Sequence, residues 1–215
     1  MTKKTFWTDP YQTIIETRIN SVNGQVITVE ETIFFAFSGG QESDTGTIGG
    51  YQVIEARKVG QEIEYVLPEN HKIKKDDKVK IQINWERRYN LMRLHFAAEL
   101  ILEIAYKKLK GSEKIGAHIA EDKARIDFKW PMSISALLPE IATEAESIIK
   151  KDQKIISNFS DEQNEKRYWA IEGVAKVPCG GTHLKNAGEV GSIRLKRKNI
   201  GKGKERIEIF LQEQS

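Results

Sequence analysis

The stretch "ERRYNLMRLHFAAELILEIAYKKL" (86–109) contains no glycine or proline and is rich in leucine, alanine, glutamate and lysine. These residues are good helix formers, so the stretch predicts one long α-helix that ends at Gly111. Its apolar residues cover much of the helix circumference, which is typical of a helix that is buried on most sides. We therefore expect it to be the central helix of a domain.

The chain before this helix has a different pattern. Short runs rich in β-branched residues predict strands at 13–20, 24–35, 49–59, 62–67 and 78–85. "SVNG" (21–24) and "PENH" (68–71) predict turns between them. Several short strands at close spacing favour a small β-barrel or sandwich, which we place in residues 1–85.

Strands and one further helix follow the long helix. Strands are predicted at 124–130, 154–159, 168–179, 191–197 and 206–212, and a helix at 137–151 with Pro139 in its first turn. Residues 161–167 read as a short helix or a polar loop. The fold class is therefore α+β, and residues 86–215 form a second domain with a long central helix and an antiparallel sheet.

Composition limits the classes of function. No run approaches the roughly 18–20 apolar residues of a membrane span, and the N-terminus lacks the apolar region of a secretory signal. One cysteine in 215 residues cannot form an internal disulfide, so we expect a cytoplasmic protein. Residues 1–84 hold 10 basic and 12 acidic residues, whereas the remainder holds 24 and 19. A polyanionic partner is therefore expected at the C-terminal part.

Two pairs of side chains have the spacing of metal ligands. His95 and Glu99 lie at positions i and i+4 of the predicted helix, so both can reach one point. Cys179 and His183 are also four residues apart, in "CGGTH" (179–183). Two imidazoles, a thiolate and a carboxylate suit Zn²⁺ better than Mg²⁺ or Ca²⁺. Each pair alone is a weak signal, since helical His/Glu pairs and buried cysteines usually have no ligand role.

Four longer segments resemble one family in the right order. "VPCGGTHLKNAGEVGSIRL" (177–195) resembles a segment of the editing domain of alanyl-tRNA synthetase and of its free-standing relatives, the AlaX proteins. "FFAFSGGQESDTGTI" (34–48) is similar to the glycine-rich segment of the barrel that precedes that domain, and "ERRYNLMRLHFAAELIL" (86–102) and "DKARIDFKW" (122–130) match two further family segments. The layout resembles the medium-sized AlaX class.

The resemblance implies a trans-editing hydrolase that cleaves serine, and often glycine, wrongly esterified to the acceptor end of tRNA(Ala). It also implies zinc held by His95, Cys179 and His183, while Glu99 stands where the family has a second helical histidine. Glu99 is then a ligand, which we favour, or it leaves an open metal position, or it acts as general base. A family threonine is Phe96 here. Phe96 is either part of the pocket or a core residue.

Two further segments are candidates for substrate contacts. Thr182 is a candidate for recognising the serine hydroxyl, or for a structural role in its turn. The glycine-rich loop consists of Ser38, Gly39, Gly40 and Gln41. Its glycines permit positive φ or close approach of the backbone. Gln41 contacts substrate or the interdomain face, unless the loop is only a tight connection.

For tRNA, the basic segment 194–206 is either a phosphate-binding hairpin or a solubilising edge. Its basic residues are Arg194, Lys196, Arg197, Lys198, Lys202, Lys204 and Arg206.

Arg87, Arg88 and Arg93 either extend that basic surface or flank the helix. Two alternative functions stay open beside serine-specific editing. One is a tRNA-binding protein of the same fold whose catalysis is weakened by Glu99 and Phe96, and the other is a deacylase for another misacylated tRNA.

Overall fold

The computed structural model describes residues 2–212, and the chain divides into two compact units. The first unit contains the chain up to Ser38 together with Glu42–Tyr89, and the second contains Gly39–Gln41 together with the chain from Asn90 onward. The sequence assigned the whole glycine-rich loop to the first domain. Residues Gly39–Gln41 instead group with the second unit, where Gln41 contacts His95 and Thr182.

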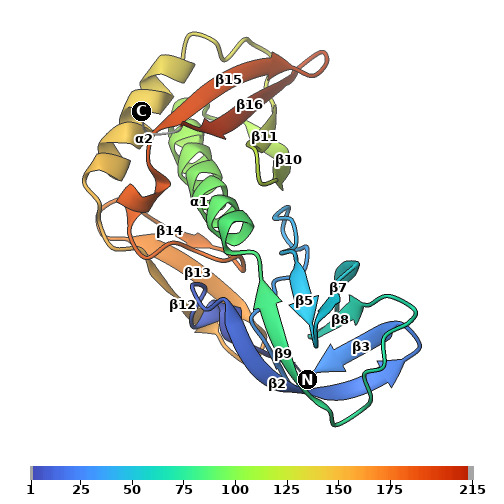
Figure 1. Ribbon diagram of the computed structural model, residues 1–215. Helices are drawn as coiled ribbons and strands as arrows, with labels where there is room; N and C mark the ends of the chain where they lie inside the picture. Colours follow the sequence, from blue (N-terminus) through green and yellow to red (C-terminus); the bar gives the residue numbers. More distant parts are fainter. Residues whose placement is uncertain (1, 213–215) are drawn as a thin grey trace. The chain divides into compact units, whose positions relative to one another are not determined.

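The first unit is built on seven strands of one curled antiparallel sheet, in the order β6-β5-β9-β2-β3-β8-β7 (Figure 1). A short parallel pair, β1 with β4, and the 3₁₀ helix η1 complete it. The strand order does not confirm the predicted closure into a barrel. The elements are β1 (Lys3–Lys4), η1 (Thr5–Trp7), β2 (Ile14–Asn23), β3 (Val26–Val29), β4 (Glu31–Thr32), β5 (Gly46–Ile48), β6 (Tyr51–Gln52), β7 (Glu55–Val59), β8 (Glu62–Val66) and β9 (Lys78–Ile83).

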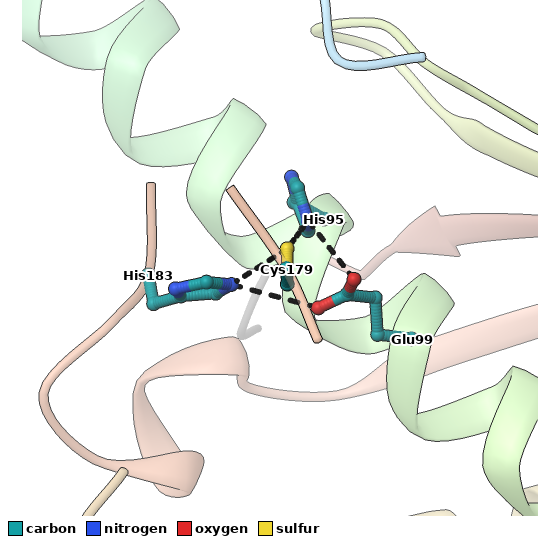
Figure 2. Close-up of side chains that lie close together, drawn as sticks. All are labelled: His95, Glu99, Cys179 and His183. Atoms are coloured by element: carbon teal, nitrogen blue, oxygen red, sulfur yellow. Dashed lines mark hydrogen bonds and ion pairs between the residues drawn. The ribbon is translucent and has the colours of Figure 1, made fainter. Parts of the chain in front are cut away.

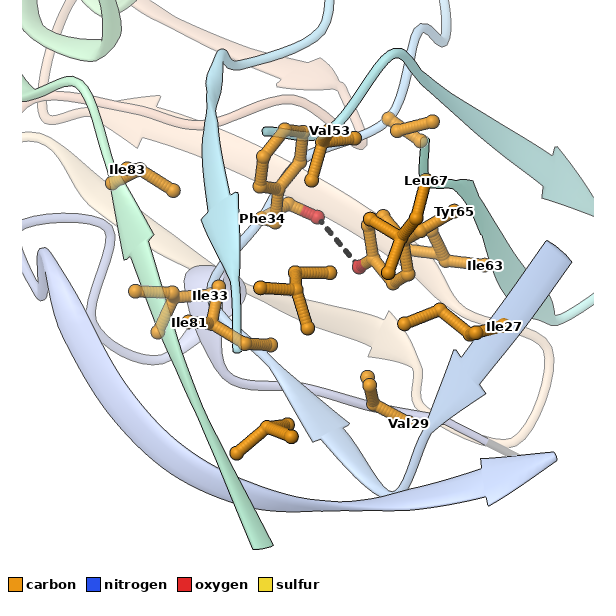
Figure 3. Packing of buried hydrophobic residues seen from close by; sticks show 14 of the residues in the cluster. Ile27, Val29, Ile33, Phe34, Val53, Ile63, Tyr65, Leu67, Ile81 and Ile83 are labelled. Carbon is orange, nitrogen blue, oxygen red and sulfur yellow. Dashed lines mark hydrogen bonds between the residues drawn. The ribbon is translucent and has the colours of Figure 1, made fainter. Parts of the chain in front are cut away.

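The core of this unit follows from the period-2 pattern of its strands. In β9 the buried residues Val79, Ile81 and Ile83 alternate with exposed polar ones, as one sheet face requires. Figure 3 shows these isoleucines packed with residues of β3 and β8. Tyr65 brings a hydroxyl into this core, and that hydroxyl lies 2.7 Å from the Thr32 hydroxyl. The buried phenol is therefore not left without a partner.

The long helix α1 (Trp85–Lys108) matches the predicted helix to within one residue at each end. The Asn84 side chain accepts a hydrogen bond from the backbone N–H of Arg87 at 3.0 Å, as an N-cap residue does. Many residues around the helix are fully buried, among them Leu91, Leu94 and Ile101. The prediction of a central helix buried on most sides is confirmed.

The second unit contains the rest of α1, two antiparallel sheets and a second helix. One sheet has the order β10-β11-β16-β15 and the other β12-β13-β14, so the α+β prediction is confirmed. The elements are β10 (Glu113–Ile119), β11 (Ala124–Lys129), α2 (Leu138–Lys150), β12 (Ile156–Asp161), β13 (Lys166–Ile171), β14 (Ala175–Pro178), η2 (Ala187–Val190), β15 (Ile193–Asn199) and β16 (Lys204–Leu211).

Several local features differ from the sequence prediction. The strands predicted at 24–35, 49–59 and 168–179 are each divided in two, and β5 was not predicted. Strand β10 was not predicted, because its pattern is interrupted by Gly116, where the pairing with β11 has a register shift. Of the two alternatives for residues 161–167, the polar loop is confirmed: residues 162–165 make the turn that joins β12 to β13. Strand β2 continues to Asn23, so the first predicted turn begins only at Gly24, whose φ is +57°. In the described chain no helix is both long and apolar enough to span a membrane.

Candidate metal centre

Each element brings one or two side chains to a common point in the second unit. His95 and Glu99 project from one face of α1, one turn apart, as their spacing predicts. Cys179 comes directly after β14, and His183 follows in the loop that leads to η2. Gly181 lets this loop approach α1, because a Cβ atom there would lie 2.1 Å from His95 Cε1. Only glycine permits the turn at this distance.

Four donor atoms converge between these elements (Figure 2). The Cys179 sulfur lies 3.1 Å from His95 Nε2 and 3.2 Å from His183 Nε2. The carboxylate oxygens of Glu99 lie 3.4 Å from His95 Nε2 and 3.5 Å from His183 Nε2. One ligand atom from each of the four residues lies within 4.8 Å of all the others. The four residues that the sequence singled out are thus brought together.

The donor set and its spacing fit a tetrahedral metal ion. Zinc bonds of roughly 2.0–2.3 Å place neighbouring ligand atoms about 3.3–3.7 Å apart, close to the distances found here. Glu99 Oε2 is buried and has no hydrogen-bond partner, which is costly unless a cation satisfies it. In the described part of the chain, this is the one group of three or more such side chains that could hold a metal.

The charges in the cluster support each other. Burial raises the pKa of the Cys179 thiol, but His95 and His183 outweigh burial and lower that pKa to about 7. Burial likewise opposes ionisation of Glu99, yet the two histidines hold its pKa well below its usual range. Burial disfavours the protonated histidines, whereas the neighbouring thiolate and carboxylate raise the pKa of both. A bound metal ion would take the place of the histidine protons.

Gln41 holds His95 from the side opposite the cluster. Its Oε1 lies 2.5 Å from His95 Nδ1 and also accepts the backbone N–H of Thr182 at 3.3 Å. The Gln41 amide N–H donates to the Thr182 hydroxyl at 2.9 Å. With Nδ1 donating to Gln41, His95 Nε2 presents its lone pair to the cluster. Metal-binding histidines are commonly oriented by such an outer partner.

His183 has its own outer partner. The Ser157 hydroxyl lies 3.1 Å from His183 Nδ1, so His183 Nε2 faces the thiolate. Arg167, which is buried, donates to the same hydroxyl at 3.0 Å and to the Gly181 carbonyl at 3.3 Å. Burial lowers the pKa of this guanidinium to about 10, and it still carries its charge at neutral pH. Arg167 therefore connects Ser157, the outer partner of His183, to Gly181 of the "CGGTH" loop.

The remaining pocket candidates are more deeply buried than a substrate contact requires. Phe96 is fully buried and packs edge to face against Trp169, with ring centroids 5.1 Å apart. Thr182 is also buried, and its hydroxyl is engaged by Gln41. These contacts support the core role for Phe96 and the structural role for Thr182.

The glycine-rich loop behaves as its composition predicts. Gly39 and Gly40 both have positive φ, and a Cβ atom on Gly40 would lie 2.8 Å from the Ala117 carbonyl oxygen. Ser38 belongs to the first unit. Gln41 is fully buried against His95. Its role as outer partner was not foreseen, since nothing in the sequence links position 41 to position 95.

The candidate tRNA-binding residues separate into two groups. Arg197 forms a two-bonded ion pair with Glu205, and Arg206 forms one with Asp127. Of the helix arginines, Arg88 is fully buried and paired with Asp44. The other five candidates in segment 194–206 form no ion pair in the described chain: Arg194, Lys196, Lys198, Lys202 and Lys204.

Comparison with known proteins agrees with this site. Residues 170–208, which include Cys179 and His183, match the family model of the threonyl and alanyl tRNA synthetase second additional domain. The chain is 31% identical over 216 residues to the alanyl-tRNA editing protein AlaX-M of Pyrococcus horikoshii, and the match covers 99% of both chains. The chain belongs to the AlaX family of alanyl-tRNA editing proteins. It resembles AlaX-M of Methanosarcina mazei equally, at 31% identity, 100% of this chain and 98% of the relative.

The AlaX family is related to a much larger enzyme. The alanine–tRNA ligase of Methanococcus aeolicus is 33% identical to 96% of this chain, but the match covers only 25% of the ligase. The full-length matches to AlaX-M proteins therefore describe this chain better than the ligase does. The expected resemblance to the free-standing, medium-sized AlaX class is confirmed.

Proposed function

We propose that the protein is a zinc-dependent aminoacyl-tRNA deacylase that hydrolyses the ester of mischarged Ser-tRNA(Ala). The observation that carries this proposal is the convergence of His95, Glu99, Cys179 and His183 in a chain of the AlaX family. The names of the relatives state that they edit alanyl-tRNA. Serine as the amino acid removed, and zinc as the metal, are the finer parts of the proposal.

The four donors would hold the metal as a closed set. We take Glu99 as a ligand, because its carboxylate lies at ligand distance from both histidine nitrogens and one of its oxygens has no hydrogen-bond partner. With four side chains as ligands, zinc would supply Lewis-acid stabilisation of charge on the ester carbonyl only if it accepted a fifth ligand. With a thiolate and a carboxylate as ligands, the bound ion is formally neutral, which weakens that effect.

The chain's own residues provide orientation. Gln41 fixes the tautomer of His95 through its amide oxygen, and Ser157 holds the ring of His183 in its orientation. Arg167 holds Ser157 and the Gly181 carbonyl together, so that the loop carrying Cys179 keeps its place beside α1. Preorganised groups of this kind lower a barrier because they need not rearrange during the reaction.

Discrimination between serine and alanine needs a polar group that pairs with the serine hydroxyl. Thr182 is a poor candidate, since its buried hydroxyl already binds Gln41. We infer that the selecting group lies elsewhere around the centre.

The test is release of serine from Ser-tRNA(Ala), with Ala-tRNA(Ala) as the substrate that must be spared. We expect hydrolysis of the first and at least about a hundredfold slower hydrolysis of the second. The Cys179→Ala variant beside the native protein separates metal-dependent catalysis from background. No serine release by the native protein would favour a tRNA-binding protein with weakened catalysis. Release of another amino acid instead would indicate a deacylase for a different misacylated tRNA.

A further inference from the structure

The four-stranded sheet of the second unit has one buried and one polar face. In β16, Ile207 and Ile209 are fully buried, so the alternating residues Arg206, Glu208 and Phe210 lie on the opposite face. Strand β15 pairs with β16 along its whole length and forms the edge of the sheet (Figure 1). Its residues Arg194, Lys196 and Lys198 lie opposite Phe210, Glu208 and Arg206 and therefore belong to the same polar face.

This polar face is strongly basic. It carries eight basic side chains against three carboxylates, a net charge of +5. The basic residues are Lys123, Arg125, Lys129, Arg194, Lys196, Lys198, Lys204 and Arg206, and the carboxylates are Glu113, Asp127 and Glu208. Three of them, Lys123, Arg125 and Lys129, come from the neighbourhood of β11 and do not belong to the hairpin that the sequence singled out.

Two of the three carboxylates, Asp127 and Glu208, are already engaged. Asp127 accepts hydrogen bonds from Arg125 and Arg206. Glu208 lies 3.1 Å from the Lys123 ammonium. On this face the basic side chains of β15 are less well compensated: in the described chain Arg194, Lys196 and Lys198 form no ion pair, although Lys198 contributes to lowering the pKa of Glu208. The face therefore keeps a row of uncompensated positive charge along its edge strand.

Phe210 gathers three of these cations. The Arg194 guanidinium lies 4.6 Å from its ring centroid, the Lys196 ammonium 5.5 Å and the Lys123 ammonium 5.9 Å. Cation–π contacts at such distances hold cations over a ring. They also bring three like charges together, of which Lys123 is paired with Glu208, whereas Arg194 and Lys196 form no ion pair in the described chain. Phe210 thus positions a cluster of charge on the sheet.

From this arrangement we propose that the polar face of β11, β16 and β15 binds the phosphate backbone of an RNA duplex. Alternate side chains recur about every 6.6–6.8 Å along a strand, so β15 presents a regular row of charges to a regular row of phosphates. Such contacts do not read bases. This proposal rests on the proposed function in taking the tRNA acceptor stem as the natural duplex.

An acidic bilayer is the less suitable partner. Amphipathic surfaces that bind bilayers stably insert large apolar side chains between lipids. On this face the large apolar residue is Phe210, which is only partly exposed and lies beneath three cations. Phosphate contacts by the cations need no insertion and leave the ring in its place.

A charge-matched pair of variants tests the surface. Lys196→Ala/Lys198→Ala removes two lysines that alternate on β15, and Lys78→Ala/Lys80→Ala removes two exposed lysines that alternate on β9 in the first unit. The ligand is a hairpin RNA duplex with a single-stranded CCA end that carries no amino acid. Its binding is measured by fluorescence anisotropy over a range of salt concentrations. We expect the β15 variant to bind on the order of tenfold more weakly, with a salt slope smaller by about two.

Several outcomes overturn the proposal. One is equal loss of affinity in the two double variants. A second is equal affinity for a single strand of the same length, and a third is loss of binding to phosphatidylserine vesicles without loss of RNA binding. Because the RNA is not aminoacylated, the result does not depend on hydrolysis. If the native protein releases no serine, but only the β15 variant loses affinity for RNA, the RNA-binding surface stands and the proposed deacylase function fails.

Substitutions of Phe210 test its positioning role separately. Phe210→Leu keeps an apolar side chain but removes the ring face, whereas Phe210→Tyr keeps the ring. We expect the leucine variant to bind the duplex several-fold more weakly with little change in salt slope, since all charges remain, and the tyrosine variant to bind as the native protein does. Equal binding by the leucine variant, with unchanged thermal unfolding, would remove Phe210 from the surface.

Discussion

Helix α1 carries two buried charged clusters that differ in how they are satisfied. At Arg88 the guanidinium donates to both oxygens of Asp44 and to the carbonyls of Ile33 and Pro10. Asp44 in turn accepts the backbone N–H of Phe35 at 2.6 Å. Neither side chain is exposed. This cluster belongs to the first unit and is complete within the protein.

The cluster at His95 is different. Its donor atoms point at one another across 3.1–3.5 Å, and Glu99 Oε2 has no hydrogen-bond partner. Its outer side is ordered by Gln41 and Ser157, whereas at its centre four potential metal ligands contact one another and Glu99 Oε2 keeps no hydrogen-bond partner. The difference indicates that the first cluster stabilises the fold and the second is arranged for a ligand. Substitutions in the first should therefore change stability, and substitutions in the second should change metal binding.

The largest effect is expected from Cys179→Ala. Loss of the thiolate removes the softest ligand, so we expect zinc affinity to fall on the order of 10³–10⁴-fold and serine release to fall to background. Zinc content by mass spectrometry and zinc affinity by competition with a chromogenic chelator measure this. The unfolding free energy of the metal-free protein should change little. If the metal-free Cys179→Ala variant is destabilised by several kcal/mol, the cluster at His95 stabilises the fold as the cluster at Arg88 does.

The next largest effect is expected from Asp44→Ala. It leaves Arg88 buried without its carboxylate, which should cost about 3–5 kcal/mol of unfolding free energy. Urea denaturation measures this, with Glu42→Ala as the control. Glu42 pairs with Arg87 near the surface, so its removal should cost no more than about 1 kcal/mol. The Asp44 variant that still folds should keep its zinc, and loss of zinc with full stability would reverse the assignment of the two clusters.

An intermediate effect is expected from Gln41→Ala. Without the acceptor at His95 Nδ1, zinc affinity should fall roughly 10–100-fold. Gln41→Glu keeps an acceptor oxygen for His95 and should restore most of that affinity, although it cannot donate to Thr182. The same zinc competition measures both variants. If the alanine and glutamate variants lose affinity equally, Gln41 acts by packing and not through His95.

The smallest effect is expected from Glu99→His. A histidine at this helical position can offer its own nitrogen, so zinc should be retained. The bound ion would then carry a positive formal charge, and serine release should be equal or a few-fold faster. Loss of zinc in this variant would show that the site requires a carboxylate.

The sequence contained much of the metal site but not its outer shell. His95 with Glu99, and Cys179 with His183, are visible because residues four apart meet locally. Joining the two pairs across 84 positions depended on resemblance to a family. Gln41 and Ser157 could not be found in this way, since their contacts arise only when distant segments fold together.

The fold, like the metal site, was predictable where local sequence determines it and not where distant segments pair. Helix α1 was predictable because its composition alone favours a helix. Strand β10 was missed at its register shift, and the closure of the first sheet depends on pairing between strands that no local pattern encodes. On the second sheet the basic hairpin was visible, but the contribution of β11 and the central place of Phe210 were not.

Zinc analysis of the native protein tests the account most directly. The protein, purified without chelators, should contain about one zinc ion per chain. Glu103→Ala, which removes a carboxylate one turn farther along α1, should keep that ion, whereas Glu99→Ala should lose most of it. Less than about a tenth of an equivalent of zinc in the native protein, or equal zinc in the two glutamate variants, would contradict a four-ligand centre completed by Glu99.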